Sequence, residues 1–290
     1  MTYPAFILFA LVVVGFLMFL FVLPPMVSLL QESNVELPFT TKILVFVTNV
    51  LQNYWWLALI MIIGGLIGMK SRYSVEVVPV GPTPAGAGPL AAVREAWAVP
   101  GFRLLTGGFF VCGFQLAFIG IHLPGYLTLC SMPVALGGTA LAVIGAFNMV
   151  GSWGCGMLGQ RWSPRLLLAA IYAIRGVVIA LFVWLPASPA GVLVFAAVMG
   201  LLWLGTVPLT SHLIARLFGP RYMGTLFGVV FLGHQLGAFV GAWAGGALFD
   251  STGSYDAVWW ATAALGLVAA LVHLPIPEHP QTAAAIAAAE

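Results

Sequence analysis

The side chains that could take part in chemistry are few, and they stand inside long apolar segments of the chain. Arg175 brings a positive charge to the middle of the apolar run at 166–185. Uncharged polar side chains stand inside other apolar runs, namely Gln115, Asn148, Thr206, His212, His234 and Gln235. Polar groups enclosed in apolar segments commonly line a solute pathway or link neighbouring helices. This distribution favours binding or transport over catalysis.

The sequence contains no arrangement of residues that is typical of an enzyme, a metal site or a cofactor site. The eight acidic residues lie outside the apolar runs or at their ends, so no carboxylate pair can act inside them. Cys112, Cys130 and Cys155 lack the spacing of a zinc site or a disulfide framework. We therefore predict a protein that is not an enzyme and binds no metal or cofactor.

The sequence leaves two interpretations of Arg175 open. In the first, the guanidinium faces a water-filled cavity and attracts an anionic solute such as a carboxylate, which it binds through two hydrogen bonds. In the second, it donates to helix ends or carbonyl groups of neighbouring helices and fixes one helix in place. A charge at the centre of a membrane span costs about 2.5–3.5 kcal/mol on insertion scales, so either role must offset that cost.

The composition is that of an all-α integral membrane protein embedded in a lipid bilayer. Of the 290 residues, 62% are hydrophobic and 6% are charged. A soluble domain carries about 25% charged residues, so a soluble fold is excluded. The net charge of +2 is too small to indicate a nucleic-acid partner.

Eight apolar runs can be assigned as membrane spans, each of which takes about 20 residues of helix. Two lie in residues 1–72, at 5–23 and within 43–69. A Pro/Gly-rich segment at 73–100 is interpreted as a cytoplasmic linker. Six further spans occupy residues 101–280, and an Ala-rich tail covers 281–290. The six are expected at 104–123, 134–158, 166–185, 190–215, 223–249 and 257–274.

The basic residues indicate how these spans are oriented. With eight spans both termini lie on one side, and eight of the ten basic residues fall in loops on that side. Lys42 falls on the opposite side, and Arg175 lies within a span. Because short loops rich in Lys and Arg stay in the cytoplasm, we predict a multi-pass protein of the cell inner membrane with both termini cytoplasmic.

Small residues and a proline mark two spans as closely packed or bent. Glycines recur every fourth residue within 223–249, at Gly233, Gly237, Gly241 and Gly245. This spacing makes a groove on one side of a helix, where a neighbouring backbone can approach closely. Pro208, preceded by Gly200 and Gly205, interrupts the span at 190–215. The interruption predicts either a break that frees backbone groups for binding or an ordinary kink.

Three motifs carry a resemblance to a known family. Residues 156–165, GMLGQRWSPR, are similar to a cytoplasmic loop motif written GxLxDRxGRR, with Gln160 at the place of its Asp. Residues 217–228 and 250–255 are similar to the entry and exit of that family's eleventh helix. On these motifs, residues 90–280 resemble the C-terminal half of a major facilitator superfamily transporter, of the monocarboxylate and oxalate/formate type. The loop residues that the resemblance assigns to conformational change are Gly156, Gly159, Arg161 and Arg165.

This resemblance implies that the six spans correspond to helices seven to twelve of that fold. In the fold, the seventh, eighth, tenth and eleventh helices line the solute cavity. The lining residues implied here are Gln115, Asn148, Trp203, Thr206, His234 and Gln235. Arg175 would lie on the ninth helix, which is usually peripheral, and it is kept as a substrate-binding candidate because of its charge.

The first part of the chain resembles a different family. Pro24 and the runs at 37–42 (LPFTTK) and 53–56 (NYWW) are similar to a membrane segment of the inner-membrane platform protein of type II secretion and type IV pilus systems. The resemblance covers residues 1–70.

These observations predict transmembrane transport of a small anionic organic solute by alternating access. A facilitator needs two six-helix halves around its substrate, so we expect a second half-bundle, from a homodimer or a separate N-terminal-half partner. The alternatives are a non-transporting assembly subunit related to the secretion or pilus platform and an inactive fused fragment.

Overall fold

The computed structural model describes residues 88–279. The chain divides into two compact units, residues 1–79 and 80–290, and the described residues belong to the second. The spans predicted within residues 1–72, most of the predicted linker and the tail at 281–290 lie outside the described residues.

Residues 88–279 fold into helices joined by short turns, without a strand in this part of the chain. The helices are α4 (Pro89–Ala98), α5 (Pro100–Leu129), α6 (Val134–Arg161), α7 (Pro164–Trp184), α8 (Pro189–Leu202), α9 (Thr206–Phe218), α10 (Met223–Thr252) and α11 (Asp256–His273). With α8 and α9 taken together, they provide six segments that are long and apolar enough to cross a membrane. Each of the six overlaps one of the spans that the sequence predicts for this region.

The helix ends follow from local sequence. Proline stands in the first turn of α5, α7 and α8, where its missing N–H costs no helical hydrogen bond. Ser163 and Ser188 cap α7 and α8 by accepting from the amides of Leu166 and Gly191. Gly253 ends α10 with φ +70°, a left-handed backbone conformation that residues other than glycine rarely adopt.

Two details differ from the expectation. The segment expected to be a linker contains helix α4, which begins at Pro89 and ends just before Pro100, where the proline favours an extended preceding residue. Helix α5 continues through Pro124 to Leu129 instead of stopping at 123. Gly137 of α6 lies against Pro124, since a Cβ there would come within 2.9 Å of the proline Cβ. A membrane helix tolerates an internal proline where neighbouring helices or side chains bond the backbone groups that the proline leaves free.

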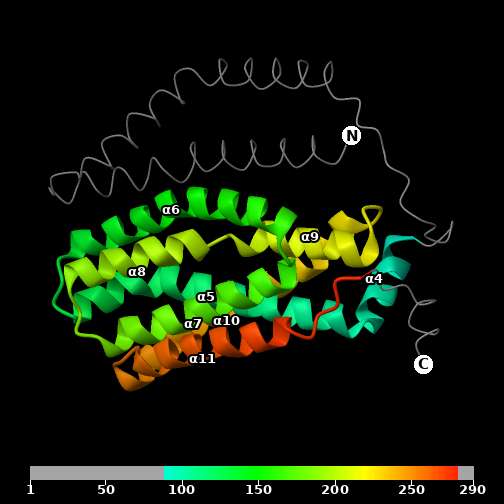
Figure 1. The fold of residues 1–290 in the computed structure, drawn as a ribbon. Helices are drawn as coiled ribbons and strands as arrows, with labels where there is room; N and C mark the ends of the chain where they lie inside the picture. Colours follow the sequence, from blue (N-terminus) through cyan, green and yellow to red (C-terminus); the bar gives the residue numbers. More distant parts are fainter. Residues whose placement is uncertain (1–87, 280–290) are drawn as a thin grey trace, which may run out of the picture. The chain divides into compact units, whose positions relative to one another are not determined.

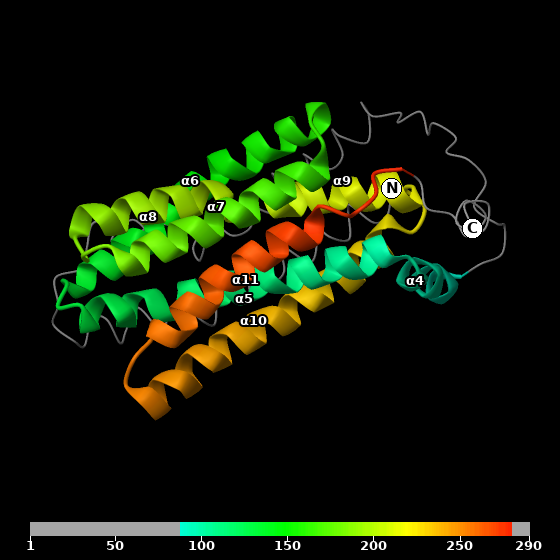
Figure 2. The same ribbon diagram turned by 60° about the horizontal axis from the view of Figure 1, so that its bottom comes forward.

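The spans lie side by side along their lengths, as Figures 1 and 2 show. The most extensive packing joins α5 with α10, α7 with α11, and α6 with α8. The α5–α10 contact runs along the glycine groove: a Cβ on Gly237 would lie 1.9 Å from the Phe110 carbonyl oxygen, and one on Gly241 would lie 2.3 Å from that of Phe114. Gly233 and Gly245 face Thr106 and His122 of α5 in the same way. Helix pairs in lipid rely on such close backbone approach.

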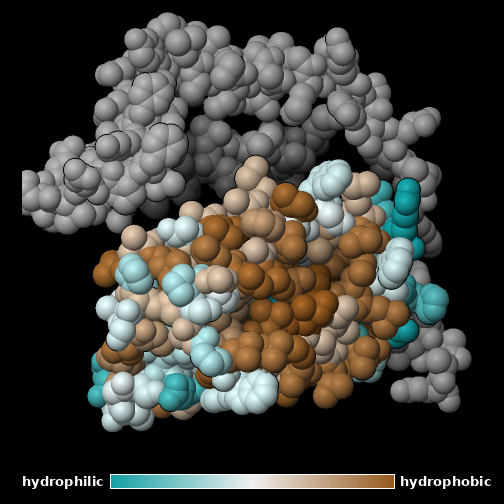
Figure 3. All heavy atoms as spheres, turned by 60° about the vertical axis from the view of Figure 1, so that its left-hand side comes forward, coloured by the Kyte–Doolittle hydropathy of each residue, from teal (hydrophilic) through white to brown (hydrophobic). Residues whose placement is uncertain are grey.

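The surface matches a membrane environment. Figure 3 shows apolar side chains over the middle of the bundle and hydrophilic ones gathered toward its ends. Trp153 of α6 and Phe239 of α10 are each 69% exposed, as lipid-facing or partner-facing side chains are. The arginines of the loops and helix ends lie at one end of the bundle, at positions 94, 103, 161, 165, 216 and 221. Asp250 and Asp256 stand at the opposite end of the bundle.

Candidate functional site

The fourth described span is broken between α8 and α9. A continuous helix would bond the carbonyls of Leu202 and Trp203 to the N–H groups of residues 206 and 207. Here the Val207 N–H bonds the Leu204 carbonyl at 3.0 Å, and the Trp203 N–H turns back to Gly200 at 3.0 Å. Pro208 adds to the break because it has no N–H to offer. The two carbonyls at the end of α8 are therefore left for other partners.

Arg175 supplies those partners from the middle of α7. Its Nη2 donates to the Leu202 carbonyl and, at 2.6 Å, to the Trp203 carbonyl. Its Nη1 donates to the Cys112 Sγ at 3.4 Å. The side chain is fully buried, and the guanidinium carbon lies 5.5 Å from the centre of the Tyr172 ring. The geometry is that of the second interpretation of Arg175, in which the guanidinium links helices through backbone carbonyls.

Asn148 of α6 holds the other side of the break. Its Oδ1 accepts the Leu204 N–H at 3.0 Å and the Ser152 hydroxyl at 3.1 Å. The backbone groups released between α8 and α9 are thus bonded by side chains from two different helices. Backbone groups inside a lipid bilayer need hydrogen-bond partners, so these side chains make the break compatible with a membrane.

A buried polar group from α5 completes this arrangement. The Cys112 Sγ lies 3.4 Å from the Thr206 Oγ1 at the start of α9, and both side chains are fully buried. We call Cys112, Asn148, Arg175, Trp203 and Thr206 the helix-break cluster. The structure brings together four of the predicted substrate-binding residues here, since Cys112 is the one member that the sequence did not single out.

His234 and Gln235 approach the cluster from α10. The His234 Nδ1 lies 3.1 Å from the Gln235 Oε1, and its ring packs against those of Phe109 and Phe231, with centroid distances of 5.0 and 5.4 Å. His234 also interacts with the Cys112 thiol. His234 is partly buried and Gln235 is exposed, so this pair connects the cluster to the outer face of α10.

Gln115 lies away from the break. It is fully buried on α5, and its Nε2 donates to the Thr262 carbonyl of α11 at 3.1 Å. Its Oε1 is buried without a hydrogen-bond partner. His212 is also separate, because it stands further along α9 near Gly159 and Arg216. The polar residues predicted to line a solute path are therefore found partly at the helix break and partly at these separate positions.

The charge of Arg175 is not balanced by a carboxylate within the described residues. The ion pair found in residues 88–279 joins Arg216 and Glu278, at the arginine-rich end of the bundle. The end of α8 carries a partial negative charge from its aligned peptide dipoles, which offsets part of the guanidinium charge.

The residues of the loop motif lie at that arginine-rich end. Gly159 is buried against α9, where a Cβ would come within 2.6 Å of the Leu209 Cδ2. Gly156 is partly buried and Arg161 is exposed. Arg165 donates from Nη1 to the carbonyls of Leu274 and Ile276, at 3.1 and 3.2 Å. The loop is thus tied to the segment that follows α11.

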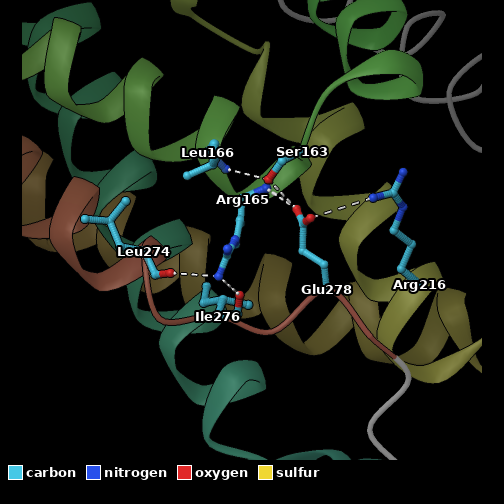
Figure 4. Close-up of polar contacts among 7 residues, drawn as sticks. All are labelled: Ser163, Arg165, Leu166, Arg216, Leu274, Ile276 and Glu278. Atoms are coloured by element: carbon cyan, nitrogen blue, oxygen red, sulfur yellow. Dashed lines mark hydrogen bonds and ion pairs between the residues drawn. The ribbon is translucent and has the colours of Figure 1, made fainter.

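Glu278 is the centre of this end of the bundle (Figure 4). Its Oε1 accepts the Ser163 hydroxyl at 2.6 Å and the Arg165 amide at 3.1 Å, and its Oε2 lies 4.0 Å from Arg216 Nη1. Partial burial alone would raise the pKa of this carboxyl. The hydrogen bonds and the two arginine charges outweigh burial, so the pKa of Glu278 is lowered. The carboxylate thereby joins the α6–α7 loop, α9 and the segment after α11.

Sequence analysis missed Glu278, Ser163, Arg216 and Cys112 as members of these sites. Glu278 lies more than a hundred residues from Ser163, so no local spacing could have paired them. The available signal was a single acidic residue between prolines, in PIPEHP, directly after the last span. For Cys112 the signal was weak, because a lone cysteine in an apolar run is most often a packing residue.

The fold and this distribution of polar groups define an all-α, multi-pass membrane protein with a six-span bundle. Residues 155–289 match the family model of the Major Facilitator Superfamily. The chain is 29% identical over 158 residues to the "Uncharacterized MFS-type transporter YcxA" of Bacillus subtilis, covering 53% of this chain and 38% of that protein. It is 25% identical over 179 residues to the "MFS transporter asaE" of Aspergillus flavus, covering 60% of this chain and 39% of that protein.

These matches support the predicted resemblance of the six-span part to this superfamily. The chain spans less than two fifths of the length of either relative. The monocarboxylate and oxalate/formate branch stays a prediction. The matches do not support the resemblance of residues 1–70 to the secretion platform protein, nor do they favour an assembly subunit over a transporter.

Proposed function

We propose that this chain provides one six-span half of a membrane transporter, which moves a small anionic organic solute by alternating access. The helix-break cluster and the neighbouring pair His234–Gln235 form its half of the solute path. The arginine-rich end faces the cytoplasm of the cell's inner membrane. The observation that carries the proposal is the break between α8 and α9, with bonded polar side chains from three other helices around it.

A broken span surrounded by polar groups is what a solute path requires. Solute and ion sites in membrane carriers commonly lie where a helix is interrupted, because the free backbone ends and nearby side chains supply hydrogen bonds. Asn148, Trp203 and His234 are only partly buried, and Gln235 is exposed. These four side chains are therefore the ones we assign to direct solute contact.

The preference for an anion rests on Arg175. Its donors are engaged by Leu202, Trp203 and Cys112, and its side chain is fully buried, so we assign it a long-range role. An unbalanced positive charge acts over several ångströms in a low-dielectric interior. Arg175 would attract a carboxylate to the break, while the other polar side chains hold the solute.

The need for a second half-bundle is supported by the uneven burial of the spans. In the most apolar part of α5, 61% of the residues are buried, against 22% for α6 and 17% for α10. Asn148 belongs to α6, and His234 and Gln235 belong to α10. The two least buried spans therefore carry three of the four proposed contacts, as expected if a second half covers them. A second copy of this chain or a separate N-terminal-half partner could supply it.

The Glu278 network is proposed to control the cytoplasmic end of this half. It ties the α6–α7 loop, α9 and the segment after α11 into one unit. A unit of this kind moves as a rigid body when the two halves rock against each other. Gly156, Gly159, Arg161 and Arg165 would take part as the loop that meets the second half.

Uptake into proteoliposomes tests the proposed function. Vesicles containing the full chain are given a radiolabelled small carboxylate or the neutral amide of the same size. We expect saturable uptake of the carboxylate, reduced at least about tenfold by Gln235→Ala, because a lost hydrogen bond to a charged group costs about 1.5–3 kcal/mol. Thr139→Ala, which removes an exposed polar group from α6, serves as the control.

Two results would contradict parts of the proposal. Equal uptake of the amide and the carboxylate would remove the anion preference while leaving transport in place. No uptake by folded protein, either alone or crosslinked as a dimer, would show that this chain does not transport without another component.

A further inference from the structure

We propose that Arg175 is a built-in cation of the broken span. Its guanidinium occupies the position between the end of α8 and the start of α9 where an interrupted transmembrane helix would otherwise take up a mobile cation. The inference goes beyond the proposed transport, since it concerns what keeps the break in shape whether or not a solute moves.

The end of α8 is built like a cation site. The carbonyls of Leu202 and Trp203 converge on one group, and the Cys112 sulfur contacts the same group from α5. The aligned peptides of α8 add a partial negative charge at this end. Interrupted helices in ion-coupled carriers use such carbonyls and helix C-termini to coordinate ions.

Arg175 fills that site permanently. Its guanidinium is always charged and presents several donors in a fixed plane, so a single side chain can serve two carbonyls and a sulfur. The group is fully buried, and within residues 88–279 no carboxylate contacts it. The two carbonyls and the Cys112 sulfur are therefore the acceptors that this part of the chain offers to the charge. Because the cation is tethered to α7, the break cannot lose it by dissociation.

Titratable side chains near Arg175 come from four helices. Cys112 approaches from α5 and Tyr172 from α7 itself, while Cys155 of α6 and His234 of α10 lie further out. None of these is a carboxylate, and the acceptors that contact the guanidinium are the two carbonyls and the Cys112 sulfur. The break should therefore depend on the guanidinium and not on the salt in the medium.

Hydrogen exchange of the backbone amides at 203–207 tests the proposal in the full chain, held in lipid nanodiscs. In the unaltered protein we expect slow exchange that is the same in sodium, potassium or choline chloride. Arg175→Ala should speed exchange at these amides at least about tenfold, as expected when a charged hydrogen bond is lost. Millimolar guanidinium chloride should then slow it again, because the free ion can enter the vacated position.

One control variant and two contrary outcomes make the test decisive. Arg103→Ala, an exposed arginine at the bundle end, should show no response to guanidinium. Unchanged exchange in Arg175→Ala, or faster exchange that guanidinium does not slow, would overturn the proposal.

If Arg175→Ala does not fold, Arg175→Lys and Arg175→Met replace it. Arg175→Lys keeps the positive charge, whereas Arg175→Met keeps only the length of the side chain. The amides at 203–207 should therefore exchange more slowly in Arg175→Lys than in Arg175→Met. Equal exchange in the two would show that Arg175 acts by packing, and would overturn the built-in cation. Failure of uptake by the unaltered chain would leave this result unaffected, so the two proposals fail separately.

Discussion

Arg175 in the middle of α7 donates at 2.6 Å to the carbonyl of Trp203, at the point where α8 ends. This one contact accounts for two features that would each be costly alone. A buried charge gains acceptors, and a carbonyl released by a broken helix gains a donor. The same pairing of a side chain with a released backbone group recurs on the other side of the break, between Asn148 and Leu204.

Replacement of Asn148 should destabilise the break from the α6 side. Asn148→Ala leaves the Leu204 N–H without its acceptor, which is expected to cost roughly 1–3 kcal/mol. The change is read from the thermal unfolding midpoint of the purified protein. Ser152→Ala is the matched control, because it removes the other donor to the same oxygen and leaves the backbone bond intact. A larger effect of Ser152→Ala than of Asn148→Ala would contradict this account.

The glycine groove of α10 should tolerate no side chain where it meets α5. A methyl group at Gly237 would lie 1.9 Å from the Phe110 carbonyl oxygen. Gly237→Ala is therefore expected to destabilise the folded protein by roughly 1–3 kcal/mol or more, as overpacking of a core does. Unfolding in increasing denaturing detergent measures the change.

Gly246 provides the control on the same helix. A Cβ there meets nothing within 4 Å. Gly246→Ala should stabilise by roughly 0.5–1 kcal/mol, because alanine loses less backbone freedom than glycine on folding. Equal effects at the two positions would show that the α5–α10 contact does not depend on the groove.

Stability should fall in acid partly through Glu278. Its pKa is lowered in the folded protein, so the carboxylate stabilises the fold above the unfolded carboxyl value of about 4.3. That contribution is lost as pH falls through the lower, folded pKa. Glu278→Gln should therefore be less stable than the unaltered protein at neutral pH and should converge with it in acid. Parallel thermal unfolding curves across the whole pH range would contradict this role.

The Ser163 hydroxyl should contribute more to the stability of the fold than an ordinary helix cap does. It caps α7 and also donates to Glu278 at 2.6 Å, whereas Ser188 only caps α8. Loss of a cap costs about 0.5–2 kcal/mol at either position. Ser163→Ala also loses the hydrogen bond to Glu278, so it should lower the free energy of unfolding more than Ser188→Ala does. In a Glu278→Gln background the difference should shrink, which a double-mutant cycle measures. An unchanged difference would remove Glu278 from the explanation.

The spans of the described region could be predicted from the sequence because membrane helices are set by local rules. Hydrophobic length, prolines in the first turn and loop arginines mark where each helix begins and ends. The same rules marked Pro208 and the glycines before it as an interruption, and the structure has separate helices there, ending at Leu202 and restarting at Thr206.

What the sequence by itself determined is therefore the all-α membrane fold, the six described spans and the polar side chains enclosed in them. Tertiary structure alone decided their partners: Arg175 with the end of α8, Asn148 with Leu204, Gln115 with Thr262, and Glu278 with Ser163. The physical reason is range. Helix formation depends on residues three or four apart, whereas each of these hydrogen bonds joins residues 27 to 147 positions apart and exists only once the helices have packed.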